Sequence, residues 1–269
     1  MLRVIISPAK KMIAGSESFA VRDVPALSER VTRLLDALVR LDATDLQRLW
    51  NVSDWLLPAC LETLAELRRH GVPQDAGDLL DPVFSGRVSP AVFSYVGIQY
   101  QSMAPAVLDE PALAWLQDHL RILSGFYGCV RPFDAVLPYR LEMGAKLAVD
   151  GATDLYGFWG DAIARAVADE GCGHVVNLAS VEYAKAVLPH LDALGIPCTT
   201  CIFGESLKDG RPVQRSTASK TARGSMVRWM AERNVDDPAE LTRFDVGYRF
   251  APELSRVGGG AETLVFMRA

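Results

Sequence analysis

Residues 174–204 read HVVNLASVEYAKAVLPHLDALGIPCTTCIFG, and this stretch indicates the class of fold. HVVNLA and CTTCIFG are short apolar, partly β-branched runs with the length of a buried strand. VEYAKAVLPHLDAL, which lies between them, has the composition of a helix, and Ser180 stands where a helix N-cap is favoured. Strand, helix and strand in this order predict a βαβ unit with parallel strands.

The rest of the chain places a long helical middle between the first strand and this βαβ unit. Apolar residues recur at strand or helix spacing in six further segments: strands at 2–7 and 262–268, and helices at 24–41, 43–70, 111–123 and 217–234. A break is expected near residues 51–53, where Asn and Ser interrupt the pattern. The order predicts an α+β (mixed α/β) fold. We expect one domain over residues 1–269, with a mixed sheet, surrounding helices and a possible helical subdomain at 25–130.

The bulk composition is that of an ordinary globular protein. The chain has 269 residues, of which 49% are hydrophobic and 23% are charged. No stretch approaches the roughly 18 consecutive apolar residues of a membrane span. MLRVIIS is interrupted by Pro8 and Lys10 too early to be a signal peptide. We therefore expect a cytoplasmic protein without membrane association, without an obligate protein partner and monomeric.

The cysteines and histidines do not suggest a metal or redox centre. Five cysteines is an odd number, and only Cys198 and Cys201 have redox-motif spacing. Both fall inside a predicted strand, whereas a redox pair places its first thiol at a helix start. The four histidines stand apart from one another in the sequence. We predict buried strand cysteines, no metal and no cofactor.

Basic residues are segregated along a chain whose net charge is −5. Residues 1–11 carry three bases and no acid, and residues 207–233 carry seven bases against two acids. Residues 118–146 carry four bases against three acids. An acidic body with basic segments can form a local positive cleft. The alternative is that these bases are scattered over solvated faces.

A glycine break in residues 124–128, SGFYG, follows the helix predicted to begin at Pro111. A glycine hairpin after a helix can present backbone N–H groups to a phosphate, with Arg131 and Arg140 nearby adding charge. An ordinary glycine C-cap followed by a loop is the alternative. Lys220 and Arg223 share a face of a later helix, where Gly224 either admits an anionic partner or packs on another helix.

An enzymatic function is the second hypothesis. Candidate acids or bases are Asp161, Glu142 and Glu182, and Lys10 or Lys220 would serve as a cation or nucleophile. No Gly-rich phosphate loop or Gly-x-Ser-x-Gly elbow occurs. These residues would suit an enzyme acting on a nucleotide or on damaged nucleic acid. We favour a non-enzymatic binding protein and leave the enzymatic alternative open.

Seven stretches of the sequence, taken together and in order, resemble the YaaA family of bacterial peroxide-stress proteins. They run from Arg3 to about Phe266 and read IISPAKKM, GIQYQSMAP, LRILSGFYG, RPFDAVLPYRLEMG, LYGFWGD, VVNLASVEYAKAV and KTARGSMVRWMAE. The resemblance implies resistance to hydrogen peroxide, protection from iron-driven Fenton damage and binding of duplex DNA. It also implies a single α/β body with a helix-hairpin-helix element and a positively charged cleft.

The resemblance also assigns candidate DNA-binding residues. The hairpin would comprise Leu123, Ser124, Gly125, Phe126, Tyr127 and Gly128. The cleft would comprise Lys10, Arg121, Arg131, Arg140, Lys146, Lys185, Lys220 and Arg223. The chain departs from the family in two places. Its glycines are one residue further apart than in a typical helix-hairpin-helix, and residues 97–100 lack an acid that some members carry.

Overall fold

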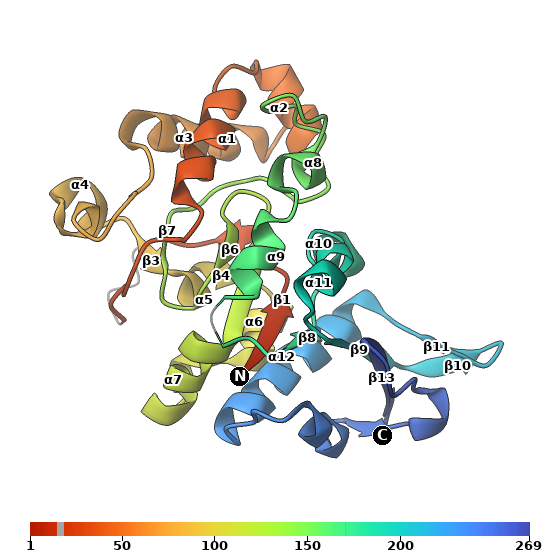
Figure 1. Ribbon diagram of the computed structural model, residues 1–269. Coiled ribbons are helices and arrows are strands. Elements are labelled where there is room, and N and C mark those ends of the chain that lie inside the picture. The colour runs from red at the N-terminus through yellow and green to blue at the C-terminus, as the bar shows by residue number, and fades with distance from the viewer. Residues whose placement is uncertain (15–18, 170) are drawn as a thin grey trace. The chain divides into compact units, whose positions relative to one another are not determined.

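The computed structural model describes residues 1–14, 19–169 and 171–269 (Figure 1). The fold is mixed α/β, with a seven-stranded mixed sheet in the order β12-β13-β9-β8-β1-β5-β6. The chain forms two compact units that alternate along the sequence. Unit one comprises Met1–Ser7, Val96–Arg121 and Val167–Ala269, and unit two comprises Pro8–Tyr95 and Ile122–Ala166.

Unit one contains the parallel strands and the longest helix among the described residues. Its strands are β1 (Leu2–Ile6), β8 (His174–Asn177), β9 (Cys198–Gly204), β10 (Ser206–Lys208), β11 (Arg211–Val213), β12 (Tyr248–Phe250) and β13 (Ala261–Arg268). Its helices are α6 (Ile98–Met103), α7 (Glu110–His119), α10 (Val181–Ala184), α11 (Leu188–Leu191) and α12 (Ser216–Glu232). Two strands begin in one unit and end in the other, β4 (Tyr95–Val96) and β5 (Leu120–Ser124).

The predicted βαβ unit is confirmed, with one change in its helix. β8 pairs in parallel with β1 and with β9, so that Asn177 lies opposite both Ile5 and Thr200. The single helix expected after Ser180 is two short helices, α10 and α11. Pro189 explains the interruption, because proline lacks an N–H and is tolerated only in the first turn of a helix, where α11 has it.

Unit one has an aromatic core beneath α12. Phe203 of β9 stacks on Phe266 of β13 at 5.5 Å between ring centroids, and Phe244 meets both rings edge-on. Trp229 of α12 adds a further edge contact with Phe244. These rings bury a large apolar area between the helix and the sheet, which is the main stabilising term for such a layer.

Unit two holds most of the middle of the chain. Its strands are β2 (Lys11–Met12), β3 (Ser89–Pro90), β6 (Gly128–Val130) and β7 (Ala135–Val136). Its helices are α1 (Ser28–Leu38), α2 (Ala43–Trp50), α3 (Leu57–His70), α4 (Pro82–Ser85), α5 (Ala91–Ser94), α8 (Leu155–Trp159) and α9 (Ala162–Val167), the last ending one residue beyond the unit. The break expected near residues 51–53 is confirmed, since Asn51 has a left-handed φ of 48° and ends α2.

The helix expected from Pro111 to Leu123 ends early. α7 stops at His119, and residues 120–124 form β5, which is buried throughout. Its second half pairs antiparallel with β6, with Leu123 opposite Cys129 and Ser124 opposite Gly128. The glycine break is therefore the turn of a β-hairpin. The resemblance implies a helix-hairpin-helix element at this place, but the structure has two paired strands.

Candidate functional site

Two cations and a carboxylate meet in unit two, in a group that we call the Lys10 cluster (Lys10, Arg140 and Glu142). Lys10 Nζ forms an ion pair with the Glu142 carboxylate. Arg140 Nη1 donates to the Lys10 carbonyl oxygen at 3.2 Å, and Arg140 Nη2 lies 3.8 Å from Glu142 Oε1. The Lys10 side chain is 62% exposed, whereas that of Arg140 is 15% exposed. The cluster therefore offers one exposed cation, held in place by a largely buried one.

The glycine hairpin is a buried network rather than an exposed loop. The Ser124 hydroxyl accepts hydrogen bonds from the backbone N–H groups of Phe126 and Tyr127, at 3.2 and 2.8 Å. The Tyr127 hydroxyl lies 2.9 Å from the Leu137 N–H, from which it accepts a hydrogen bond. Trp159 Nε1 donates to the Gly125 carbonyl at 3.1 Å. The N–H groups of Phe126 and Tyr127 in the turn already have an acceptor, so the structure does not present them to a phosphate.

Both hairpin glycines are required by packing. A Cβ on Gly125 would lie 2.6 Å from the Leu141 carbonyl oxygen, closer than real side chains approach. Gly128 has a φ of +73°, a conformation that favours glycine, and faces Trp159 and Leu27. The close approach at Gly125 is to the segment that carries Arg140 and Glu142. The hairpin thus supports the Lys10 cluster from behind.

Arg131 is tied to two carboxylates of unit two. Its Nη2 lies 2.8 Å from Asp23 Oδ2, and its Nε lies 3.1 Å from Asp134 Oδ1. The pKa of Arg131 is raised: burial lowers it, and the pairing with Asp134 and Asp23 more than offsets that. The Arg131 cation is therefore neutralised within the unit.

Lys146 lies at a basic hollow of unit two that the sequence does not reveal. A cavity of about 690 Å³ is lined on one side by residues 144–148 and on the other by α1 and α2. Arg40 and Arg48 line it together with Lys146, and Asp45 is the acid among its lining residues. Arg40 is exposed and forms no ion pair with a described residue. We call this hollow the Lys146 cavity. In the sequence, Arg40 and Arg48 are only two separate bases, one in the turn after the amphipathic helix α1 and one on α2.

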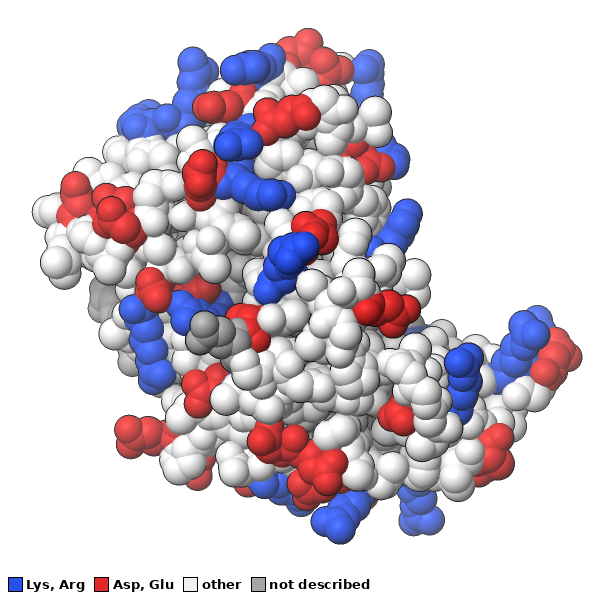
Figure 2. Space-filling view, in the orientation of Figure 1, with Lys and Arg blue, Asp and Glu red and all other residues white. Residues whose placement is uncertain are grey.

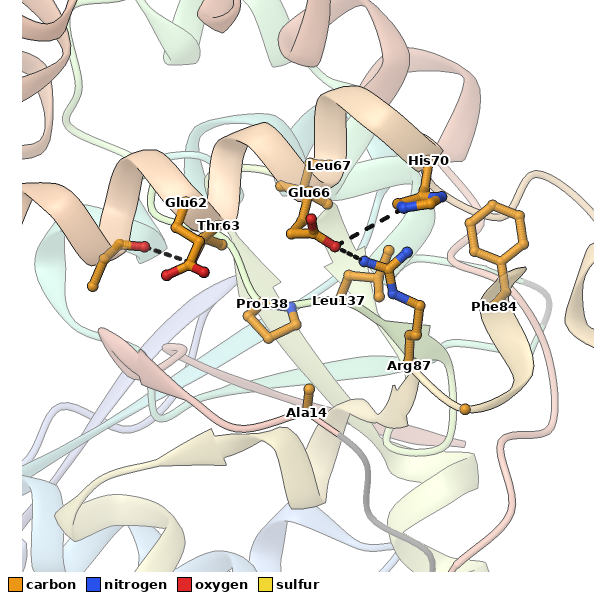
Figure 3. Close-up of a pocket in the computed structure, with 12 residues that line it drawn as sticks. Ala14, Glu62, Thr63, Glu66, Leu67, His70, Phe84, Arg87, Leu137 and Pro138 are labelled. Carbon is orange, nitrogen blue, oxygen red and sulfur yellow. Dashed lines mark hydrogen bonds and ion pairs between the residues drawn. The ribbon is translucent and has the colours of Figure 1, made fainter. Parts of the chain in front are cut away.

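A second cavity of unit two, of about 650 Å³, has an acidic lining (Figure 3). Glu62, Glu66 and His70 project into it from one side of α3, and Pro138 lies opposite. Glu66 forms an ion pair with Arg87, which also lines the cavity. Carboxylates repel a phosphate backbone, so this cavity does not suit a nucleic acid.

Arg121 is a buried structural cation of unit one. Its side chain is 4% exposed, and its Nη2 lies 2.7 Å from Asp169 Oδ2. Arg3, also buried, binds the other oxygen of the same carboxylate through Nε at 2.7 Å. Asp169 therefore bridges two buried guanidinium groups, and Arg121 has no face turned to solvent. The expectation that it contacts DNA is not supported by this geometry.

The remaining predicted cations of unit one differ in exposure. Lys185 follows α10 and Lys220 lies on α12, and both are exposed. Arg223 is half-buried on α12 near the Cys201 thiol, and burial lowers its pKa. Lys146 of unit two is 76% exposed and pairs with Asp154 at 2.8 Å.

The candidate acids are not gathered in one place. Glu142 belongs to the Lys10 cluster, while Asp161 of the same unit is exposed and holds Arg165 at 2.7 Å. Glu182 lies on α10 of unit one. Glu142 has the predicted Lys10 beside it, and the two form a candidate acid–base pair for catalysis.

The Cys198–Cys201 pair lies in β9, as predicted, and both thiols are free and buried. Burial raises the pKa of Cys198 to about 12 and raises that of Cys201 further. Thiols are nucleophilic and bind metals as thiolates, so burial holds this pair in the unreactive form.

Lys and Arg are interspersed with Asp and Glu on the face shown in Figure 2, rather than joined in one continuous patch. Several of the exposed cations on this face have acids as neighbours. Among the described residues, no helix has the length and apolar character to span a bilayer.

Comparison with known proteins identifies the family. A family model described as peroxide stress protein YaaA matches residues 2–254. A UPF0246 protein of Pediococcus pentosaceus is 41% identical over 99% of this chain and 98% of its own length. UPF0246 proteins of Desulfitobacterium hafniense and Lactiplantibacillus plantarum are 39% and 40% identical, over 100% and 91% of this chain and 98% and 91% of their own lengths. The chain therefore belongs to the YaaA family of peroxide stress proteins.

Proposed function

We propose that this protein is a cytoplasmic DNA-binding peroxide-stress protein that protects against iron-driven oxidative (Fenton) damage. Membership of the family supports the stress role. The Lys146 cavity is the single observation that carries the DNA-binding part. Arg40, Arg48 and Lys146 come from separate segments of unit two and line one hollow of about 690 Å³. Long cationic side chains around a hollow suit the phosphates of a nucleic-acid backbone.

Exposed lysines extend the proposed set of contacts. Lys10 of unit two, and Lys185 and Lys220 of unit one, have their side chains at the surface. Arg140 acts indirectly, because its guanidinium holds the Lys10 backbone. All of these groups are point charges or forks that suit phosphate oxygens, and phosphate contacts carry no sequence information. We therefore expect duplex binding with little sequence preference and strong dependence on salt.

Fluorescence anisotropy with a labelled 20-base-pair duplex tests the proposal. Binding should occur at low salt and fall steeply with added salt, with a slope of log K against log[salt] near −0.9 for each phosphate neutralised. Absence of binding at low salt would sink the proposal. Strand nicking of a plasmid by Fe²⁺ and hydrogen peroxide, with and without the protein, tests protection. Equal nicking in both reactions contradicts the protective role.

The Lys10–Glu142 pair supports a second candidate, an enzyme acting on a nucleotide or damaged nucleic acid. A lysine and a carboxylate in contact are the residue types needed for proton transfer. Product analysis after incubation with oligonucleotides carrying defined lesions decides between the candidates. Turnover lost in Glu142→Gln favours the enzyme, and no turnover across the panel removes it.

A further inference from the structure

Four buried polar atoms of unit one have no hydrogen-bond partner among the described residues, and one of them is Trp229 Nε1 of α12. The other three form one set: Gln99 Nε2 on α6, and Ser219 Oγ and Arg223 Nε on α12. Gln99 and Ser219 are only 6% and 4% exposed, so bulk water does not replace a partner. The rest of the Arg223 guanidinium likewise forms no hydrogen bond or ion pair with a described residue. Buried polar groups in folded proteins are normally paired, so this set calls for an acceptor.

The chemistry of the three groups specifies the acceptor. A guanidinium, a side-chain amide and a hydroxyl can all donate, and arginine keeps its charge even where burial opposes it. Arg223 is half-buried, burial lowers its pKa, and no described carboxylate pairs with it, so an anion from outside the chain would supply a counter-charge that the described residues do not. An oxyanion satisfies both the charge and the donors.

The two helices that carry these groups, α6 and α12, pack against each other (Figure 1). A Cβ on Gly224 would lie 2.0 Å from the Gln99 carbonyl oxygen, so the glycine allows α12 to touch Gln99 directly. Ser219 and Arg223 are four residues apart and share one face of α12. A larger residue at position 224 would separate Gln99 from the turn that carries Arg223. This contact explains why α12 has a glycine in its interior.

Arg223 lies near a part of the sheet where open α/β folds bind ligands. Arg223 lies close enough to the Cys201 thiol of β9 to influence its pKa. Asn177, the last residue of β8, is opposite Thr200, so Cys201 is one residue beyond the end of that parallel neighbour. Ligands in such folds bind outside the carboxyl ends of parallel strands. Arg223 thus lies near the part of β9 that extends past the carboxyl end of β8.

We propose that Gln99, Ser219 and Arg223 form a binding site for the phosphate group of a small phosphorylated ligand. Three donors from different side chains suit a tetrahedral phosphate better than a planar carboxylate, which a single arginine can hold in a bidentate fork. Exposed Lys220, one turn before Arg223, adds a second charge for a phosphate dianion. The site belongs to unit one alone; it shares Lys220 with the proposed duplex contacts and is separate from the Lys146 cavity of unit two.

Calorimetric titration of the full chain with inorganic phosphate and with ribose 5-phosphate tests the site, with acetate as the carboxylate comparison. Phosphate should bind, ribose 5-phosphate should bind at least as tightly, and acetate should bind at least tenfold more weakly. Arg223→Met, which keeps the volume and removes the charge, should weaken phosphate binding at least tenfold. Arg228→Gln, an equal loss of charge on the same helix, should leave it unchanged.

A thermal-shift measurement gives a second readout of phosphate binding if a variant is too unstable for calorimetry. Phosphate should raise the melting temperature of the wild type and of Arg228→Gln, but not of Arg223→Met or Gln99→Met. Equal phosphate affinity in wild type and Arg223→Met overturns the proposal, as does no phosphate binding by the wild type at millimolar concentration. Arg223→Met should leave duplex affinity within twofold of the wild type. A loss of duplex affinity as large as the loss of phosphate affinity would make Arg223 a DNA contact and overturn a separate ligand site.

Discussion

The Ser124 hydroxyl donates a hydrogen bond of 2.7 Å to the Tyr139 hydroxyl, which lies 3.1 Å from the hydroxyl of Tyr95. All three side chains are buried in unit two. The same serine oxygen accepts two N–H groups of the hairpin turn. The hairpin is thereby joined to the residue that precedes Arg140, so it positions the Lys10 cluster without touching a ligand itself.

Ser124→Ala should lower the free energy of unfolding by about 2–3 kcal/mol, because it leaves buried donors and a tyrosine hydroxyl without their partner. Urea denaturation measures this change. Ser85→Ala, at an exposed serine of the same unit, is the matched control and should be neutral within about 0.5 kcal/mol. Equal stability of the two variants would contradict the buried network.

Gly125→Ala should be more damaging than its small size suggests. The added methyl would meet the Leu141 carbonyl at 2.6 Å, and backbone on both sides cannot yield cheaply. We expect a loss of about 2–3 kcal/mol in the free energy of unfolding, the size of an overpacking defect. Gly86→Ala provides the control, because a Cβ there meets nothing within 4 Å and its φ is −96°. A neutral Gly125→Ala would mean that the turn and the Leu141 segment can move apart to admit a methyl group.

The buried thiols should resist peroxide. With the pKa of Cys198 at about 12, its thiolate fraction at pH 8 is about one part in ten thousand. The fraction rises only as the pH approaches that raised pKa, so alkylation should stay slow through the neutral range. Mass spectrometry of the native protein after hydrogen peroxide, then N-ethylmaleimide, should find Cys198 and Cys201 unmodified. Cys172, which is partly exposed, should react before them. A Cys198–Cys201 disulfide would show that β9 opens under oxidation.

Removal of the three cations of the Lys146 cavity should weaken duplex binding more than removal of one elsewhere. Each of Arg40→Gln, Arg48→Gln and Lys146→Gln should reduce affinity several-fold at low salt, and the triple variant should reduce the salt slope by about 2–3 units. Anisotropy titrations at 50–200 mM salt provide the slopes. Arg69→Gln serves as the control, because Arg69 is, like Arg48 and Lys146, an ion-paired cation of unit two, but does not line this cavity. A triple variant with the wild-type slope would exclude this cavity as the interface.

Local pattern was enough for some of the fold and not for the site. Val175, Val176 and the residues of β9 show their strand character within a few positions, so β8 and β9 could be predicted. Ile122 could not be assigned, because an apolar run reads alike as a buried strand and as the end of a buried helix. Glycine is required at position 125 because of Leu141, which is sixteen residues away in the sequence. The other cations that line a cavity with Lys146 come from the segment of α1 and α2. Such pairings are decided by tertiary packing, which one sequence does not display.

Arg121 and Asp169 separate a structural role from a DNA-binding one. Asp169→Ala would leave the buried guanidinium groups of Arg3 and Arg121 without their shared carboxylate, at a cost of about 3–5 kcal/mol. Arg121→Met removes one of those charges and leaves Asp169 paired with Arg3, so it should cost less than Asp169→Ala. Urea denaturation ranks the two variants. Because Arg121 is buried, folded Arg121→Met should bind duplex DNA within twofold of the wild type. A tenfold loss of duplex affinity with stability retained would return Arg121 to the DNA interface and show that its ion pair opens on binding.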